Sequence, residues 1–265
     1  MLQIMKRGNG MKSILEKFSL EGKVAIVTGA SRGLGQGIAV GLASAGADIV
    51  GVGSGDMPET EKLITDLGRK FHAIKANLIS QEPIPRIVEE TIKEFGKVDI
   101  LVNNAGIIRR EDAIDFSEEN WDDVLNINLK TTFFLSQAVA KQFIAQKSGG
   151  KIINIASMLS YQGGIRVPSY TASKSAVMGI TKSMANEWAG HNINVNAIAP
   201  GYMATDNTAA LRSDEARNKS IEERIPAARW GTPEDLAGAA VYLASDAASY
   251  VHGFTLAVDG GWLAR

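Results

Sequence analysis

The stretch KVAIVTGASRGLGQGIAVGLASAG (23–46) decides the fold. KVAIVTG (23–29) is apolar and β-branched and ends at a glycine, so it predicts a buried strand. GLGQGIAVGLASAG (33–46) has apolar residues at helical spacing and a glycine stop, which predicts a helix. The loop between them, TGASRGLG (28–35), has the spacing G-x-x-x-G-x-G. Glycines there allow close backbone approach to a pyrophosphate at a helix N-terminus, so we expect a dinucleotide site; a turn that serves only packing is the alternative.

The alternation of strand and helix continues through the rest of the chain. Further strands are expected at 47–53, 70–78, 98–106, 151–157, 193–201 and 254–261, and helices at 59–67, 83–95, 118–145, after Ser169 and after Pro233. The segment 202–230 is polar and irregular, with short helical pieces. This pattern predicts an α/β fold with a parallel sheet covered by helices on both faces. We expect one domain over 19–265, preceded by a flexible extension over 1–18.

Composition excludes several classes of protein. The 265 residues have a formal net charge of −1, which argues against a nucleic-acid or membrane-surface partner. The absence of cysteine excludes disulfides, zinc–thiolate sites and cysteine nucleophiles, and is compatible with the cytoplasm, where we expect the protein. No apolar run is long enough for a membrane helix. The histidines, His72, His191 and His252, lack metal-binding spacing, and G-x-S-x-G is absent, so we expect neither a metal site nor a serine hydrolase.

The polar and glycine-rich segments cluster where the expected strands end. They are TGASRGLG (28–35), NNAG (103–106), IASM (155–158) and APGY (199–202). Open α/β sheets bind ligands beyond the carboxyl ends of their strands. We therefore expect these four segments to build one site.

SYTASK (169–174) sets Tyr170 one helical turn before Lys174. Reduction of a ketone leaves an alkoxide that needs a proton, and the reverse reaction removes one. A tyrosine pKa is about 10, and a nearby ammonium or an oxidised nicotinamide lowers it toward neutral pH. Tyr170 is thus the candidate acid/base and Lys174 its activating charge, although the spacing alone also fits a surface pair. Ser157, at a strand end, can hydrogen-bond the substrate oxygen, and Ser169 after Pro168 predicts a helix cap.

These motifs occur in the order typical of a known family. TGxxxGxG, NNAG, Ser157 and the YxxxK pair resemble the classical short-chain dehydrogenase/reductase family from about residue 20 onward. The resemblance implies a Rossmann-type doubly wound sheet and NAD(P)-dependent interconversion of a hydroxyl and a ketone. It also implies that Asn128, in NINLK (126–130), holds a water in a proton relay with Lys174; Asn126 is the competing assignment.

The resemblance further implies a set of cofactor contacts. Thr205 would hold the nicotinamide carboxamide, Tyr170 and Lys174 would lie at the nicotinamide ribose, and Asn77 would replace an acid that contacts adenine. The remaining implied contacts are Gly29, Ser31, Arg32, Gly33 and Leu34 along the pyrophosphate, Leu78, Asn104, Ala105 and Gly106 on the adenosine side, and Ile198, Pro200 and Gly201 against the ring.

The residues that distinguish NAD from NADP depart from the usual pattern. An acid about 20 positions past the loop normally binds the ribose 2′-hydroxyl, but Gly53 occupies that position. Ser54 stands where NADP enzymes often have arginine, and Asp56 follows nearby. Arg32 is either a grip for a 2′-phosphate or a solvated loop charge. We expect NAD to be favoured over NADP.

Arginines near the strand ends suggest an anionic substrate, because guanidinium binds carboxylate bidentately. Arg109 or Arg166 is the expected carboxylate contact, with Arg110 and Arg212 as further candidates. Ser157, Gln162 and Tyr202 would contact substrate hydroxyls. The runs IIRREDA (107–113) and VDGGWLAR (258–265) resemble the 2-deoxy-D-gluconate 3-dehydrogenase group, also described as acting on 2-keto-3-deoxygluconate.

That resemblance implies a small sugar acid from uronate breakdown as the substrate, and a homotetramer. A 3-oxoacyl-carrier-protein reductase or a gluconate 5-dehydrogenase is the enzyme alternative, because these share the same catalytic residues. A dinucleotide-sensing binding module is the alternative that is not an enzyme. The Asn–Ser–Tyr–Lys set argues against the last of these.

Overall fold

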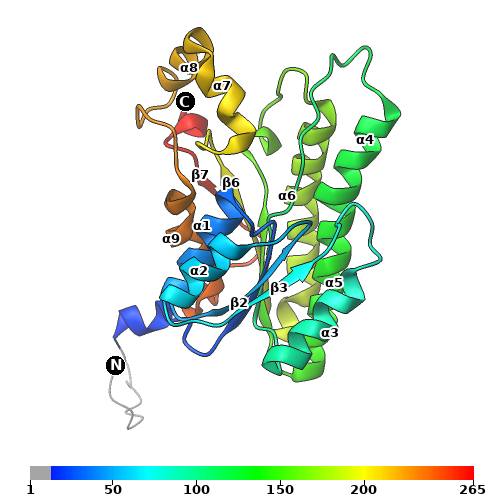
Figure 1. Ribbon diagram of the computed structural model, residues 1–265, viewed down its shortest axis with the longest axis vertical. Coiled ribbons are helices and arrows are strands. Elements are labelled where there is room, and N and C mark those ends of the chain that lie inside the picture. Colours follow the sequence, from blue (N-terminus) through cyan, green and yellow to red (C-terminus); the bar gives the residue numbers. More distant parts are fainter. Residues whose placement is uncertain (1–12) are drawn as a thin grey trace, which may run out of the picture.

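The structure, a computed structural model, describes residues 13–265. One seven-stranded parallel sheet forms its centre (Figure 1). The strand order is β3-β2-β1-β4-β5-β6-β7. The strands are β1 (Val24–Thr28), β2 (Asp48–Gly53), β3 (Phe71–Lys75), β4 (Ile100–Asn103), β5 (Gly150–Ile155), β6 (Ile193–Pro200) and β7 (Thr255–Val258). The order reverses between β1 and β4, which is where such sheets open a ligand crevice. The predicted α/β fold is confirmed.

Helices cover both faces of the sheet. On one face lie α1 (Gly33–Ser44), α2 (Pro58–Asp66) and α9 (Pro233–Ala244), and on the other lie α3 (Ile84–Phe95), α4 (Glu118–Leu125), α5 (Thr131–Gln146) and α6 (Pro168–Trp188). Alternate residues of β1 feed the two apolar cores: Ala25 and Val27 join the core under α1 and α9, and Val24 and Ile26 join the core under α5 and α6. Burial on both faces explains why the strands are continuously apolar.

Two local differences from the sequence prediction lie near the expected catalytic residues. The helix expected over 118–145 is interrupted by a π-helical turn, Asn126–Lys130. The helix with Tyr170 begins at Pro168, with Val167 at the N-cap, so Ser169 is not the cap. Proline suits the first helical position because its missing N–H has no partner there in any case. The Ser169 hydroxyl is instead buried without a hydrogen-bond partner.

The expected extension lies mostly outside the described residues, which begin at Ser13. Its described end forms a short 3₁₀-helix, Ile14–Phe18, and the Phe18 ring lies 6.2 Å from that of Tyr242 on α9. Across 13–265, no helix is long and apolar enough to cross a membrane.

The segment between β6 and α9 forms a separate layer over the carboxyl ends of the strands (Figure 1). It contains α7 (Ala209–Ser213) and α8 (Glu215–Glu222). A small apolar cluster holds it in place, with Ile221, Ile225 and Trp230 packing around Trp262 near the C-terminus. We call residues 205–224 the lid.

Candidate active site

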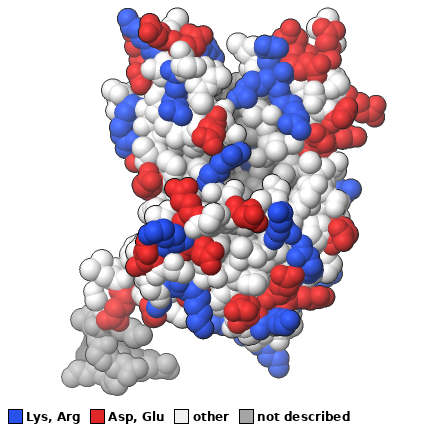
Figure 2. All heavy atoms as spheres, viewed as in Figure 1, with Lys and Arg blue, Asp and Glu red and all other residues white. Residues whose placement is uncertain are grey.

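One cavity of about 760 Å³ lies at the carboxyl ends of the strands. The loops after β1, β4, β5 and β6 line it, and the lid forms one of its walls. Figure 2 shows its opening between the α7–α8 segment and the loops after β4 and β5, with basic side chains along the border. The four segments predicted to build one site therefore meet in this cleft.

The glycine loop has the shape of a cradle for phosphates. Gly29 and Gly33 have positive φ angles of 68° and 56°, which favour glycine. A Cβ on Gly35 would collide with the Gly29 carbonyl oxygen and come within 2.5 Å of the Asn104 amide nitrogen. Gly35 thus lets the start of α1 pack closely against the loop after β1 and Asn104, which is the role of the third glycine in a dinucleotide-binding turn. The residues present fit a dinucleotide.

Most residues expected to contact the dinucleotide line this cleft. They are Gly29, Ser31, Arg32, Gly33, Leu34, Asn77, Leu78, Asn104, Ala105, Gly106, Tyr170, Lys174, Gly201 and Thr205. Ile198 and Pro200 do not line it: both are buried in β6, where Pro200 pairs with Val258. Successive side chains of a strand point to opposite faces of the sheet, and residues 198 and 200 share a face that is buried in the core.

At the edge expected for the adenosine ribose, Gly53 and Ser54 line the cleft and Asp56 does not. The Asp56 carboxylate lies 3.7 Å from the Lys75 ammonium instead. Arg32 lines the cleft, and its Nε lies 3.4 Å from the carboxylate of Asp206. Asp206 is the one acidic side chain among the described residues that line the cleft.

Tyr170 and Ser157 lie together in the cleft. Burial raises the pKa of Tyr170, while the nearby Ser157 hydroxyl and then the positive charge of Arg110 lower the pKa of this phenol. Ser157 is 7% exposed, and its oxygen accepts a hydrogen bond from the Leu159 N–H at 3.1 Å. The phenol is thus held protonated in the free protein, with a hydroxyl and a guanidinium ready to stabilise its ionised form.

Lys174 is 5% exposed and pairs with no carboxylate among the residues that the structure describes: its Nζ donates to the Ile155 carbonyl oxygen at 2.6 Å. Burial lowers the pKa of Lys174 to about 8. The ammonium lies 5.6 Å from the centre of the Tyr170 ring. The sequence suggested Lys174 as the group that lowers the Tyr170 pKa, but in the free protein Ser157 and Arg110 have that effect.

The π-helical turn presents Asn128 to the inside of the fold. Its Oδ1 accepts from the Ile107 N–H at 2.9 Å, and its Nδ2 donates to the Ile107 carbonyl and to the Ser173 hydroxyl. Asn128 thereby joins the loop after β4 to the helix that carries Tyr170 and Lys174. A turn with an extra residue is a common way to redirect one side chain within a helix.

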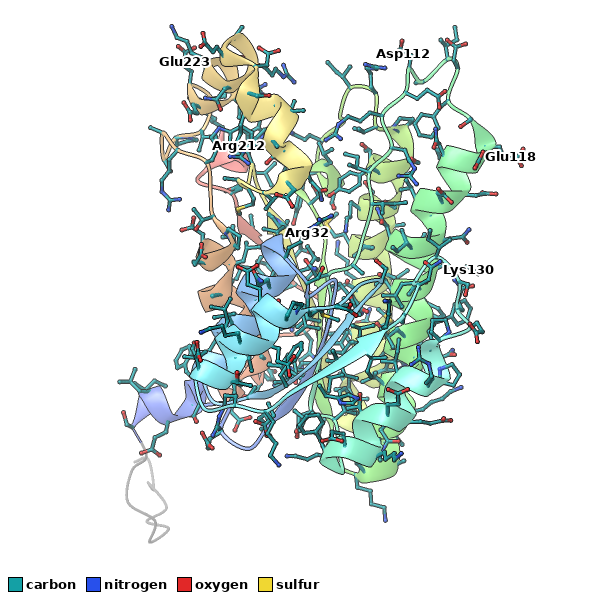
Figure 3. All side chains as sticks on the ribbon, in the orientation of Figure 1. Arg32, Asp112, Glu118, Lys130, Arg212 and Glu223 are labelled. Atoms are coloured by element: carbon teal, nitrogen blue, oxygen red, sulfur yellow. The ribbon has the colours of Figure 1, made fainter. Side chains whose placement is uncertain are left out.

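The structure does not bring the two favoured substrate arginines into the cleft. Arg109 is paired with Asp123 and Arg166 with Asp112, each at 2.9 Å. Arg212 donates to the Thr205 carbonyl and lies outside the lining residues. Figure 3 shows Arg212 and Asp112 on opposite sides of the opening.

Other basic residues take their place. Arg110, Arg217 and Arg224 line the cleft, together with the expected Ser157, Gln162 and Tyr202. Trp262 also lines it, and its indole N–H donates to the Gln162 oxygen at 3.2 Å. Arg217 and Arg224 could not be chosen from the sequence, because their segment is irregular and no strand end predicts where its side chains point. Trp262 stood only in the run VDGGWLAR, which carried the resemblance and no site role.

Known proteins share this fold and these motifs. A family profile described as "Enoyl-(Acyl carrier protein) reductase" matches residues 29–263. A 2-dehydro-3-deoxy-D-gluconate 5-dehydrogenase of Dickeya dadantii is 67% identical over 252 residues, which are 95% of this chain and 100% of the relative.

Solved structures agree with this comparison. A putative 2-deoxy-D-gluconate 3-dehydrogenase of Agrobacterium tumefaciens with bound NADP is 56% identical, with a TM-score of 0.89 over 94% of this chain and 99% of that one. A gluconate 5-dehydrogenase of Burkholderia cenocepacia in complex with NADP and tartrate is 38% identical, with a TM-score of 0.89 over 95% and 99% of the two chains.

The fold and cleft are those of a dinucleotide-dependent oxidoreductase. The chain belongs to the short-chain dehydrogenase/reductase family.

Proposed function

We propose that this protein interconverts a hydroxyl and a ketone on a deoxy or keto sugar acid, with 2-dehydro-3-deoxy-D-gluconate as the first substrate to test. One observation carries the choice of an acid: Arg110, Arg217 and Arg224 line the same cleft as Tyr170, and Asp206 is the one acidic residue among the described residues that line it. Such a cleft favours an anion over a neutral sugar. The names of the Dickeya and Agrobacterium relatives, both sugar-acid dehydrogenases, support the proposal.

In the proposed reaction the bound nicotinamide supplies or accepts the hydride. Tyr170 gives its phenolic proton to the oxygen of the ketone, or takes the proton of the hydroxyl in the reverse direction. Ser157 donates a hydrogen bond to that same oxygen and stabilises the charge that develops on it. Lys174 would hold the nicotinamide ribose and, through a water held by Asn128, pass a proton between Tyr170 and solvent. Arg110 stabilises the ionised phenol.

The cleft accepts NAD or NADP, and we propose that Arg32 determines how strongly the phosphorylated form binds. The expected preference for NAD lacks support, since the Agrobacterium and Burkholderia relatives were solved with NADP. Gly53 and Ser54 have no carboxylate, so nothing at these two positions repels a 2′-phosphate. The Ser54 hydroxyl can donate a hydrogen bond to it.

Arg32→Ala is expected to raise the KM for NADPH about tenfold and to leave the KM for NADH nearly unchanged, because only the former has a 2′-phosphate to pair with the guanidinium. Steady-state kinetics with both cofactors measures this. Arg69→Ala, which removes an arginine paired with Glu21 outside the cleft, is the control. Equal changes for both cofactors would contradict the assignment of Arg32.

The substrate proposal is tested with a panel of 2-dehydro-3-deoxy-D-gluconate, 2-deoxy-D-gluconate, D-gluconate, glucose and a 3-hydroxyacyl thioester, each with NAD and NADP. The deoxy or keto sugar acids are expected to have a kcat/KM at least about tenfold above that of glucose, because glucose has no carboxylate. Highest activity with the thioester would favour the acyl-carrier-protein reductase, and highest activity with D-gluconate would favour the gluconate dehydrogenase. Cofactor binding with no turnover would favour a sensor.

Oligomeric state and location remain predictions. Trp121, Phe134 and Ile144 are large apolar side chains exposed on α4 and α5, and an interface between copies of the chain would bury them. We propose a homotetramer, located in the cytoplasm. Light scattering of the purified protein measures the mass, and a monomer would contradict the proposed assembly.

A further inference from the structure

Two arginines of the lid, Arg217 and Arg224, face the cleft without an acidic partner. Both line the cavity, and neither is within 4 Å of a carboxylate among residues 13–265. Arg217 and Ile221 lie four positions apart on one face of α8, and Arg224 follows in the turn after the helix, where its N–H donates to the Ile221 carbonyl oxygen at 3.0 Å. Ile221 is 2% exposed and packs in the apolar cluster under the lid. The buried Ile221 therefore fixes this side of the lid toward the cleft.

Arg224 is further restrained by an aromatic platform. Its guanidinium carbon lies 4.2 Å from the centre of the Trp262 ring. Trp262 is 5% exposed, the Tyr202 ring packs edge-on at 4.9 Å, and the indole N–H is bonded to Gln162. A guanidinium stacked on a ring keeps its edge N–H groups free for a bidentate bond. Arg224 is thus a preorganised donor pair on a rigid support in the wall of the cleft.

The reacting carbon and the carboxylate of a sugar acid are several bonds apart, so they need separate partners. Arg110 acts on Tyr170, since its charge lowers the pKa of that phenol, and it therefore serves the reacting end. Arg224 lies next to the lid helix α8, in the wall of the same cleft. Gln162 links the two regions: its oxygen is held by Trp262, which leaves its amide N–H groups free to donate to a hydroxyl.

We propose that Arg224, stacked on Trp262, is the residue that binds the carboxylate of the substrate and so selects acids over neutral sugars. The inference rests on the proposed function and specifies which part of the cleft recognises the acid. Trp262 and Gln162 already connect this part of the lid to the loop after β5, so the carboxylate would bind at a fixed position in the cleft wall.

The test compares Arg224→Gln with the wild type on 2-dehydro-3-deoxy-D-gluconate and on its primary amide, which has the same shape but no charge. For the acid, Arg224→Gln lowers kcat/KM about 10- to 100-fold, mostly through KM, because a charged bidentate contact is lost. For the amide the change is less than about threefold, because there is no charge for Arg224 to bind. Arg224→Lys keeps the positive charge but lacks the planar pair of N–H donors, so its kcat/KM for the acid should lie between those of Arg224→Gln and the wild type.

Lys219→Gln is the matched control. Lys219 lies on α8, five positions before Arg224, pairs with Glu223 at 3.8 Å and lies outside the cleft, so its replacement removes the same charge without touching the site. Equal losses for acid and amide, or equal effects of Arg224→Gln and Lys219→Gln, would overturn the assignment of Arg224 while the proposed function stands. A wild-type protein inactive on every sugar acid would overturn the proposed function itself, and the carboxylate subsite with it.

Discussion

Tyr170→Phe is expected to lower kcat by about 10²- to 10⁴-fold, the contribution typical of a positioned general acid or base. The substitution removes one oxygen from a partly buried side chain, so the ring still packs beside Lys174, 5.6 Å from its ammonium. Cofactor affinity should therefore stay within about threefold of that of the wild type. Stopped-flow hydride transfer and titration of the cofactor's fluorescence measure the two quantities separately.

Tyr161→Phe provides the control for this experiment. Tyr161 follows the same strand as Ser157, but its hydroxyl only approaches the Thr255 carbonyl at 3.5 Å and does not line the cleft. Its removal should change kcat less than twofold. If Tyr170→Phe kept half or more of the wild-type rate, another group would have to supply the proton.

Much of the fold could be predicted because its signals are local. The apolar spacing predicts β1 and α1. The glycines between them predict a tight turn, and the structure has positive φ angles there, at Gly29 and Gly33. The meeting of Ser157, Tyr170 and Lys174 in one cleft follows from their places at strand and helix ends of a parallel sheet.

The substrate side could not be predicted in the same way. Arg109 and Arg110 are adjacent in sequence, yet one pairs with Asp123 on α4 and the other lines the cleft. Which of the two is neutralised depends on the direction of each side chain in a loop, and no periodicity specifies that. The same holds for Arg224, whose position depends on Trp262, 38 residues later in the chain.

Lys174→Met is expected to reduce kcat/KM by about 10²-fold or more and also to weaken cofactor binding. The ammonium would no longer hold the nicotinamide ribose or complete the proton path from Asn128. Asn128 keeps its bonds to Ile107 and Ser173, so the fold around the site should persist. Isothermal titration with the cofactor and steady-state kinetics measure both losses. Unchanged cofactor affinity would contradict the role at the ribose.

The same variant also changes how the stability of the protein depends on pH. Burial lowers the pKa of Lys174 from 10.5 to about 8, so below pH 8 both the folded and the unfolded chain are protonated and the folded state bears the full cost of a buried charge. As pH rises from 8 to 10.5 the folded lysine loses its proton first, and that cost disappears. Methionine has no such cost, but it leaves the Ile155 carbonyl without its donor, an opposing penalty of about 1–3 kcal/mol at every pH.

The pH dependence separates these two contributions. Between pH 7 and pH 10, the wild type should gain stability relative to Lys174→Met by an amount on the order of 2 kcal/mol, whichever protein is the more stable at pH 7. Urea unfolding of the cofactor-free proteins at a series of pH values measures the difference in free energy of unfolding. A difference that stays constant with pH would mean that Lys174 keeps its ordinary pKa. In that case the buried ammonium would be stabilised by a partner other than the Ile155 carbonyl.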